Sequence, residues 1–343
     1  MKNKLLGVNA PHFINIGDYV QALASSQFYP SIDGFIQREG LKEYDGEDAK
    51  IVMNGWYMHY PIHWPPSDKI HPLFVAFHIN VSRKDKLLSP ESIAYLKKHE
   101  PIGCRDTYTR DLLLEKGVDA YFSGCMTLTL GYKYKSNRRN NKIYFVDPYV
   151  NVSKEFSYYI PKIPFFLYKF RKIAKISKKW YGKLSVQGLV KSTLFLQSYS
   201  NLFDEETLVN SEFVSQAAKK GWPETDEELL TLAERLVKQY AEAGLVVTSR
   251  IHCALPCLGL ETPVLFTNNK EPSEFSACRF GGLKELFNVI EWDNNSLRPL
   301  FPLKGKLSLN NHPENKKDWI PLAQKLIGRV KNFFKEEDYG NSK

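Results

Sequence analysis

An arginine and a histidine two residues apart have the clearest capacity for chemistry in this sequence. Arg250 and His252 follow a short apolar run, Leu245–Val247, and precede a predicted helix. Backbone amides at a helix start attract anions, and a guanidinium there offers paired donors to a phosphate or carboxylate. An imidazole with an ordinary pKa, near neutrality, can donate a proton to a substrate. The segment predicts an anion site with a general acid. The alternative is structural: Arg250 would pair with a neighbouring carboxylate and hold the loop in place, and His252 would be a buried core residue.

A second arginine stands at a similar turn into a helix. Arg105 is followed by Asp106 and Thr107, either of which can cap the helix expected over Thr107–Lys116. Because one of these two residues caps the helix, the side chain of Arg105 is free to face a cleft. A purely structural contact between Arg105 and Asp106 is the alternative interpretation.

A third candidate is the turn Asn15-Ile16-Gly17-Asp18 after the first apolar run. Asp18 is expected to cap a helix over Tyr19–Phe28, because its carboxylate can accept from the free amides of the first turn. The turn lacks the glycine spacing and the later acidic residue of a dinucleotide site, so a Rossmann cofactor is not expected.

Aromatic and histidine side chains gather between residues 56 and 78. Trp56, His59 and Trp64 could contact a ligand, and plain packing is the alternative. The histidines of this block lack the spacing of zinc ligands on a helix, so no metal site is expected.

The elements that would position these residues alternate between strand and helix. Apolar runs expected as strands include Ile51–Trp56, Leu73–Ile79 and Val118–Phe122. Thr225 and Glu228 match a capping box, and the helix that follows stops at Gly244. This alternation predicts an α/β protein with mostly parallel sheets covered by helices on both faces.

The organisation expected is two Rossmann-like α/β domains with an interdomain cleft. Residues 1–132 form the first domain, 133–142 a polar linker and 143–343 the second domain, which ends in a closing helix over 319–334. In such folds the ligand lies at the carboxyl ends of the strands, which is where both arginines are expected.

The net charge of +9 comes from one segment. Residues 157–203 hold nine Lys or Arg and no Asp or Glu, interleaved with aromatic residues. This basic aromatic insertion is either a solvated helix face or a surface for an anionic membrane or lipid-linked substrate. Nothing else in the chain is typical of a nucleic-acid module.

The remaining composition favours a cytoplasmic protein, peripheral on the inner membrane face if the insertion binds lipid. No run of 18 apolar residues is present, the apolar stretch near the start is too short for a signal peptide, and the five cysteines are odd in number.

Taken in order between residues 15 and 264, these segments resemble the polysaccharide pyruvyltransferase family. The resemblance rests on N-x-G-D at 15–18, N-G at 54–55, R-D-x-x-[ST] at 105–109, G-V-x-A and a later glycine at 117–124, and T-S-R-x-H with a following P-V at 248–264. It implies a fold similar to GT-B glycosyltransferases and a donor, phosphoenolpyruvate, in the cleft, with no further cofactor.

By this resemblance, His252 and Arg250 are catalytic, and the donor is bound by Arg105, Arg250, Ser249, Asn15, Gly17 and Asp18. The acceptor sugar would be contacted by Trp56, His59 or Trp64. A protonated His252 would serve as the general acid. The product would be a pyruvate ketal on a cell-surface polysaccharide or its lipid-linked precursor. One departure stands out: many family members have Gly-Asp-Pro where this chain has Gly124-Cys125-Met126.

Two other functions fit part of the pattern. A glycosyltransferase of similar architecture would use a nucleotide sugar, and a glycan- or membrane-binding protein would keep the fold without turnover. The sequence leaves open the acceptor sugar, the linkage and the oligomeric state.

Overall fold

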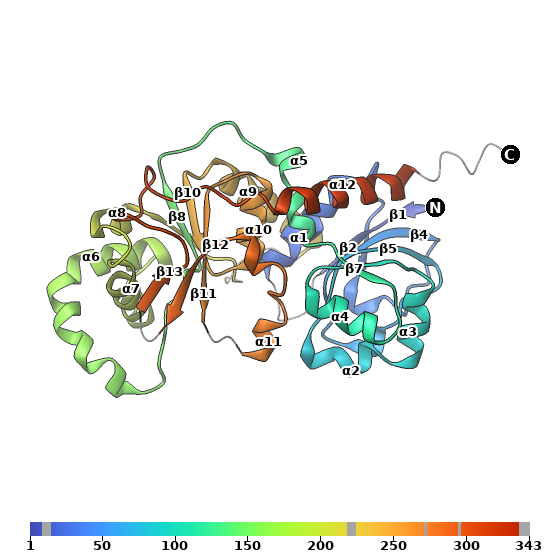
Figure 1. The fold of residues 1–343 in the computed structure, drawn as a ribbon, viewed down its shortest axis with the longest axis horizontal. Coiled ribbons are helices and arrows are strands. Elements are labelled where there is room, and N and C mark those ends of the chain that lie inside the picture. The colour runs from blue at the N-terminus through green and yellow to red at the C-terminus, as the bar shows by residue number, and fades with distance from the viewer. Residues whose placement is uncertain (9–14, 218–223, 271–272, 294–295, 336–343) are drawn as a thin grey trace.

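The computed structural model describes residues 1–8, 15–217, 224–270, 273–293 and 296–335. Two sheets, each built mainly from parallel strands, lie side by side with helices between and around them (Figure 1). The α/β class expected from the alternating pattern is therefore confirmed.

The N-terminal sheet has five parallel strands in the order β1-β4-β5-β6-β7. Their bounds are β1 Lys2–Asn3, β4 Ala49–Tyr57, β5 Ile70–Ile79, β6 Ile102–Cys104 and β7 Ala120–Phe122. A separate parallel pair joins β2, Leu5–Gly7, to β3, Phe35–Gln37. The three-residue strand β6 was not expected, and it is the strand that leads into Arg105.

The C-terminal sheet has six strands in the order β13-β12-β11-β10-β8-β9, parallel except for β13. Their bounds are β8 Ile143–Val146, β9 Glu212–Val214, β10 Leu245–Thr248, β11 Val264–Asn269, β12 Asn288–Asp293 and β13 Ser296–Pro299.

Side chains alternate between the two faces of this sheet, as the period of two in a strand requires. Phe145, Val247 and Leu265 pack in one hydrophobic cluster. Their neighbours Val146 and Val246 pack in the other. Since both faces are covered, the strands read as continuous apolar runs.

The helices fall into groups on these faces. Their bounds are α1 Ile16–Ser26, α2 Lys84–Leu87, α3 Pro90–Lys97, α4 Thr107–Glu115, α5 Gly131–Tyr134, α6 Ile163–Tyr181, α7 Val186–Tyr199, α8 Glu205–Asn210, α9 Asp226–Glu242, α10 Ile251–Gly259, α11 Glu274–Ala277 and α12 Trp319–Lys335. The basic aromatic insertion forms α6 and α7, which lie at the outer left of the molecule in Figure 1. None of these described helices combines the length and apolarity that a membrane crossing needs.

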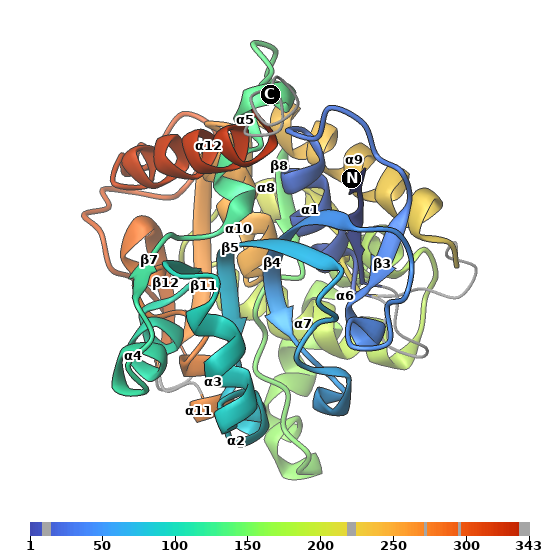
Figure 2. The same cartoon turned by 90° about the vertical axis from the view of Figure 1, so that its right-hand side faces the viewer.

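A shared apolar layer joins the two sheets. One hydrophobic cluster includes residues of β4 and β5 together with residues of α9, α10 and α12. The C-terminal helix α12 returns to the N-terminal sheet, where Lys50 Nζ donates to the carbonyl oxygen of Phe333 at 2.9 Å (Figures 1 and 2). The expected closing helix is thus confirmed, and it packs across both halves.

The first helix begins earlier than its sequence suggested. Asn15, not Asp18, is the N-cap of α1, and its Oδ1 atom accepts from the amide of Gly17 at 3.1 Å. The prediction that Asp18 caps this helix is wrong, because Ile16 and Gly17 already have helical geometry. Asp18 instead lies in the first turn, where its carboxylate is available to other partners.

Candidate anion-binding site

Arg105 carries a buried guanidinium at the turn between β6 and α4. It follows β6, its amide donates to the carbonyl oxygen of Phe77 at 2.9 Å, and its side chain is 1% exposed. Within the described residues none of its three side-chain nitrogens has a hydrogen-bond partner. Its only ion pair there is a 3.6 Å approach of Nε to Asp106 Oδ2. A buried charge left so poorly satisfied is costly, which points to an anionic ligand as the missing partner.

Asp106 is already occupied by other groups. Its Oδ1 atom caps α4 by accepting from the amide and the hydroxyl of Thr109, both at 2.9 Å. Its Oδ2 atom lies 2.6 Å from His78 Nδ1. Burial alone would raise the pKa of Asp106, but His78 and Arg105 hold it below its ordinary value. Burial, and then Arg105, lower the pKa of His78 to about 4, so a neutral imidazole donates to an ionised carboxylate.

Arg250 lies at the start of α10, directly after the carboxyl end of β10. Its amide donates to Thr248 Oγ1 at 3.0 Å, and its Nε atom donates to Asp147 Oδ2 at 2.9 Å. Ser249 Oγ donates to the carbonyl oxygen of Asp147 at 2.6 Å. The pairing of Arg250 with a carboxylate, which the sequence left open, is therefore present, and Asp147 is the partner. It holds the arginine in place while leaving its side chain 46% exposed.

His252 is buried in the first turn of α10. Its Nδ1 atom lies 3.4 Å from the side-chain nitrogen of Gln21, and its Nε2 atom has no hydrogen-bond partner in the described chain. If the Gln21 amide donates to Nδ1, the neutral ring carries its proton on Nε2 and presents a free donor.

The expectation of an ordinary pKa for His252 is wrong in the ligand-free protein. Burial, and after it the positive charges of Arg105 and Arg279, lower the pKa of His252 well below its usual value. At neutral pH the imidazole is therefore uncharged until a ligand changes its surroundings.

Asn15, Gly17 and Asp18 are brought to this site by α1. At Gly17 a Cβ atom would lie 3.1 Å from His252 Cβ, so the close approach of the helix to His252 depends on a glycine. Asp18 Oδ1 accepts from Gln21 Nε2 at 3.2 Å. Asn15 caps the helix, so its side chain is used within the fold.

Two further arginines belong to the site and were not expected from the sequence. Arg279, just after α11, is close enough to interact electrostatically with Arg105, Asp18 and Arg250. Burial, and next the charge of Arg105, lower the pKa of Arg279, which reflects a concentration of positive charge. Arg38 is 3% exposed and lies 3.8 Å from the carboxylate of Asp18. No motif marked either position.

The three expected acceptor residues separate in the structure. Trp56 and His59 have ring centroids 4.5 Å apart, and the Arg38 guanidinium lies over the Trp56 ring at 5.0 Å. Trp64 is 4% exposed in the hydrophobic core and stacks on Phe77. Its ring is therefore a packing group, because the core leaves no face of it open to a ligand.

A cavity of about 750 Å³ opens beside Arg250, at the carboxyl ends of β8, β9 and β10. Aromatic side chains line it together with basic ones: Tyr149, Trp180, Tyr181, Phe213, Lys179, Lys191 and Arg250. Burial and the charge of Asp147 raise the pKa of Tyr181 to about 12, so its hydroxyl stays protonated as a donor. Within the described residues no group of three or more His, Cys, Asp or Glu forms a cluster suited to a metal ion.

The chain matches a known family model over most of its length. The model described as "Polysaccharide pyruvyl transferase" matches residues 15–271, a span that contains Arg105, Arg250 and His252. No curated protein and no solved structure is similar enough to the chain to match it.

Proposed function

Because the chain belongs to the polysaccharide pyruvyl transferase family, we propose that it transfers the pyruvyl group of phosphoenolpyruvate to hydroxyl groups of a sugar. The product is a pyruvate ketal on a cell-surface polysaccharide or its lipid-linked precursor. The observation that carries the proposal is Arg105, a buried guanidinium in a cluster of positive charge whose donors find no acceptor among the described residues.

The charge of the donor matches the charge of the site. Phosphoenolpyruvate carries a phosphate and a carboxylate, and Arg105, Arg250 and Arg279 are close enough to influence one another electrostatically. Planar guanidinium groups bind both kinds of anion through paired donors. A bound trianion would satisfy Arg105 and offset the repulsion among the three arginines.

The chemistry requires a proton at carbon and a nucleophile at the neighbouring centre. Protonation of the methylene carbon gives a methyl group and an oxocarbenium centre, which a sugar hydroxyl attacks with loss of its proton. A second hydroxyl then displaces inorganic phosphate and closes the ketal. Arginines that hold the phosphate stabilise the charge that develops as it departs.

His252 fits the proton-transfer role only when the donor is bound. In the free protein, burial and neighbouring positive charges lower its pKa well below the ordinary value. An anion placed among those charges offsets part of their effect and so raises the pKa of His252. Donor binding would thereby prepare the imidazole to carry the proton.

The acceptor has two candidate places next to this donor site. The cavity beside Arg250 offers aromatic faces for a sugar ring and has ample volume for one. Trp56 and His59 offer a smaller aromatic surface beside Arg38. The first is favoured because it shares Ser249 and Arg250 with the donor site.

The same cavity also favours the second candidate function, a glycosyltransferase that uses a nucleotide sugar. Its aromatic lining could stack on a base, and its basic side chains could contact a diphosphate. A thermal-shift titration distinguishes the two functions, with phosphoenolpyruvate and UDP-glucose as ligands for the wild type and Arg250→Ala.

We expect phosphoenolpyruvate to raise the unfolding midpoint of the wild type and not that of the variant. At 100 times its dissociation constant a ligand stabilises the folded state by about 2.7 kcal/mol. A shift with UDP-glucose alone would contradict pyruvyl transfer and favour the glycosyltransferase.

A further inference from the structure

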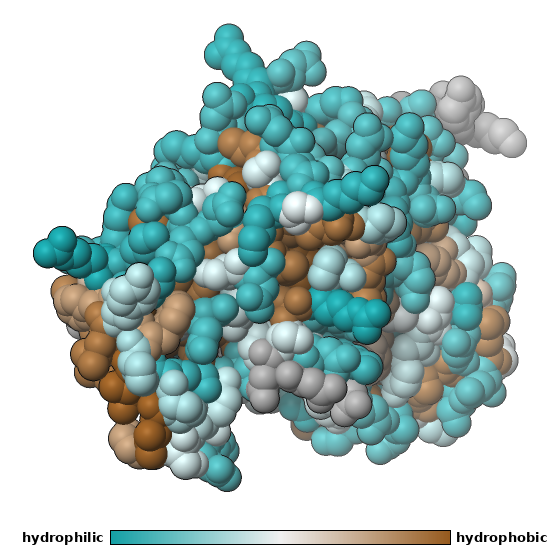
Figure 3. Space-filling model, turned by 60° about the vertical axis from the view of Figure 1, so that its left-hand side comes forward, coloured by the Kyte–Doolittle hydropathy of each residue, from teal (hydrophilic) through white to brown (hydrophobic). Residues whose placement is uncertain are grey.

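Exposed apolar side chains gather at the start of the α6–α7 insertion. Of the sixteen large hydrophobic residues that are exposed in the described chain, nine lie between residues 152 and 186. They are Val152, Phe156, Ile160, Ile163, Leu167, Tyr168, Phe170, Leu184 and Val186. Figure 3 shows apolar surface gathered on the projecting lower left of the molecule. A patch of this kind marks an interaction site.

The outer stripe of α6 divides into an apolar half and a basic half. Positions three or four apart share one face of a helix, and the exposed stripe of α6 begins with Ile163 and Leu167. Ile160 is exposed in the single helical turn that leads into α6. The stripe continues with Arg171 and ends with basic residues further along the helix. The opposite side of α6 buries Ile173, Ile176 and Ser177. The stripe is therefore a free surface of a helix that is otherwise packed.

Part of the positive charge of the insertion is used within the protein. Lys169 and Lys172 pair with Glu205, at 2.9 and 2.8 Å. Lys175 and Lys179 donate to groups at the end of α8, Asn210 among them. The side chains of Arg171, Lys178 and Lys183 are exposed and have no hydrogen-bond or ion-pair partner among the described residues. These three remain available to an anionic partner.

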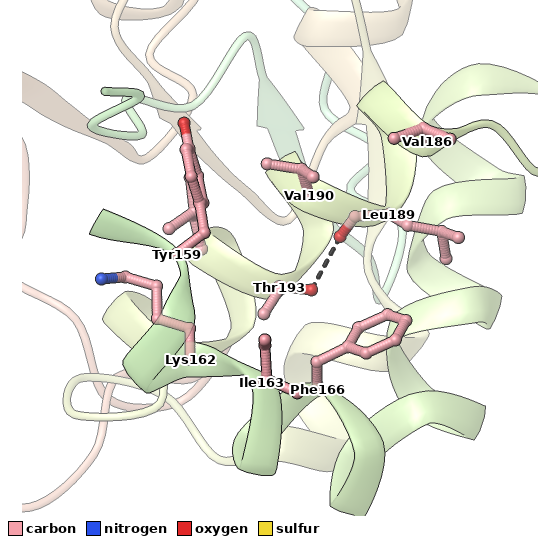
Figure 4. Close-up of a pocket in the computed structure, with 9 residues that line it drawn as sticks. Tyr159, Lys162, Ile163, Phe166, Val186, Leu189, Val190 and Thr193 are labelled. Atoms are coloured by element: carbon pink, nitrogen blue, oxygen red, sulfur yellow. Dashed lines mark hydrogen bonds between the residues drawn. The ribbon is translucent and has the colours of Figure 1, made fainter. Parts of the chain in front are cut away.

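An apolar groove between α6 and α7 opens beside this stripe. It has a volume of about 230 Å³ and is lined by Ile163, Phe166, Val186 and Leu189, among others. In Figure 4 the Thr193 hydroxyl, which is near these side chains, donates to the carbonyl oxygen of Leu189, at 2.7 Å. The polar group is thus satisfied internally, and the groove presents almost only carbon to its occupant.

We propose that the apolar stripe and groove dock on an anionic lipid bilayer. The helix would lie in the interface, with Ile160, Ile163 and Leu167 among the acyl chains and Arg171 and Lys178 against anionic headgroups. Amphipathic helices with aromatic and aliphatic residues on one side and basic residues beside them bind membranes in this way. The proposal is independent of pyruvyl transfer, although it would bring the enzyme to a lipid-linked acceptor.

Charge distinguishes the bilayer from a second copy of this chain. The segment 157–203 has no acidic residue, and Arg171, Lys178 and Lys183 keep their charge on its surface, so two such faces in contact would repel each other. An anionic surface, in contrast, complements both the charge and the apolar stripe.

The test is flotation of the full chain with vesicles of phosphatidylcholine alone or with phosphatidylglycerol at a ratio of 7:3. The wild type should float with the anionic vesicles, less at high salt, and not with phosphatidylcholine alone. The double variant I163D/L167D should stay in the lower fractions. The matched control Ile62→Asp, which changes an apolar residue that is 75% exposed elsewhere, should float as the wild type does.

The basic half is tested separately with Arg171→Ala and Lys178→Ala. Each should weaken binding to anionic vesicles roughly five-fold, the effect expected for one basic residue near a membrane surface. Equal binding to both vesicle types, no binding to either, or flotation of I163D/L167D would overturn the proposal. So would a lipid-free wild-type oligomer that the double variant converts to monomer. A phosphoenolpyruvate-induced thermal shift in the same samples tests the donor site separately.

Discussion

At the scale of single residues, the site is defined by positive charge that the fold leaves unsatisfied. Arg105 is held by its backbone and by a long contact with Asp106, while the tighter contacts of Asp106 go to Thr109 and His78. Arg250 is anchored at one nitrogen by Asp147. An anion that bridges the arginines would complete these partial arrangements.

The residue at position 125 explains part of this unsatisfied charge. Cys125 is fully buried and close enough to Arg105 for the guanidinium to influence its thiol, whose pKa is raised by burial. With its raised pKa the thiol stays neutral, so it supplies no charge that could pair with the guanidinium of Arg105.

Changing Cys125→Asp should weaken the binding of phosphoenolpyruvate, because the new carboxylate would compete with the ligand for Arg105. Isothermal titration calorimetry measures the dissociation constant, and Cys125→Asn is the matched control of similar size without the charge. If the aspartate variant binds phosphoenolpyruvate as tightly as the asparagine variant, or more tightly, Arg105 does not contact the ligand.

His252 should take up a proton when the donor binds. The free protein has a lowered pKa at this residue, so a bound anion raises the pKa and draws a proton from solution. Calorimetry at pH 7.5 in buffers with different heats of ionisation measures the uptake.

The variant His252→Gln separates this proton from any taken up by the phosphate group of the ligand. The wild type should take up more protons per bound ligand than the variant does. The same uptake by both proteins would remove His252 from the proton-transfer role.

Some of the individual site residues could be predicted from the sequence. Arg250 was expected at the site because it follows an apolar run, and Arg105 because it stands at a turn into a helix; the structure places each beyond the carboxyl end of a strand. Arg279 was not, because it follows a short helix and reaches the site through tertiary packing. The lowered pKa of His252 depends on burial and on charges distant in sequence, which no local pattern records.

At the scale of elements, the site depends on the close packing of α1 against α10. Gly17 of α1 faces His252 of α10 so closely that a Cβ atom at this position would lie 3.1 Å from His252 Cβ, tighter than an ordinary contact. Gln21, one turn later, lies within 3.4 Å of the same imidazole. The two helices therefore orient His252 from the N-terminal half of the chain.

Changing Gly17→Ala should displace His252 and weaken catalysis, since the added Cβ would lie 3.1 Å from His252 Cβ. Product formation from phosphoenolpyruvate and calorimetric donor binding should both decline, while circular dichroism stays like that of the wild type. The control Gly328→Ala lies in α12, where an added Cβ meets no atom within 4 Å. It should keep full activity and gain up to about 1 kcal/mol of stability from helix propensity. Unchanged activity of Gly17→Ala would mean that the helix contact does not position His252.

Capping chemistry explains which element boundaries were predictable. The expected capping box is confirmed, because Thr225 Oγ1 accepts from the amide of Glu228 at 3.3 Å at the start of α9. At α1 two capping residues competed, and Asn15 is used because it precedes the helical geometry of Ile16 and Gly17. The strand β6 was missed because three residues are too few to show a period.

At the scale of the whole molecule, the two sheets are coupled through one core. The cluster that holds β4 and β5 also holds α9, α10 and α12, and Tyr19 of α1 donates to Asp226 of α9 at 2.8 Å. An alternating sequence predicted the parallel sheets, but nothing local showed that α12 would cross back to the first of them.

This shared core predicts a single unfolding transition in urea, with tryptophan fluorescence and far-ultraviolet circular dichroism giving the same midpoint. Asp226→Ala should lower that midpoint in both signals, because Tyr19 would lose a buried partner at a cost of about 1–3 kcal/mol. Two separate transitions in the wild type, or a shift in one signal only, would mean that the halves unfold independently.

The measurement that tests the central claim most directly is calorimetric titration of phosphoenolpyruvate into the wild type and Arg105→Met. Methionine keeps much of the buried volume and removes the charge. The account predicts saturable binding by the wild type and a loss of roughly 2–5 kcal/mol of binding free energy in the variant, with its fold intact by circular dichroism. Binding of equal strength by both proteins would contradict the account, because the buried guanidinium would then have no part in holding the donor.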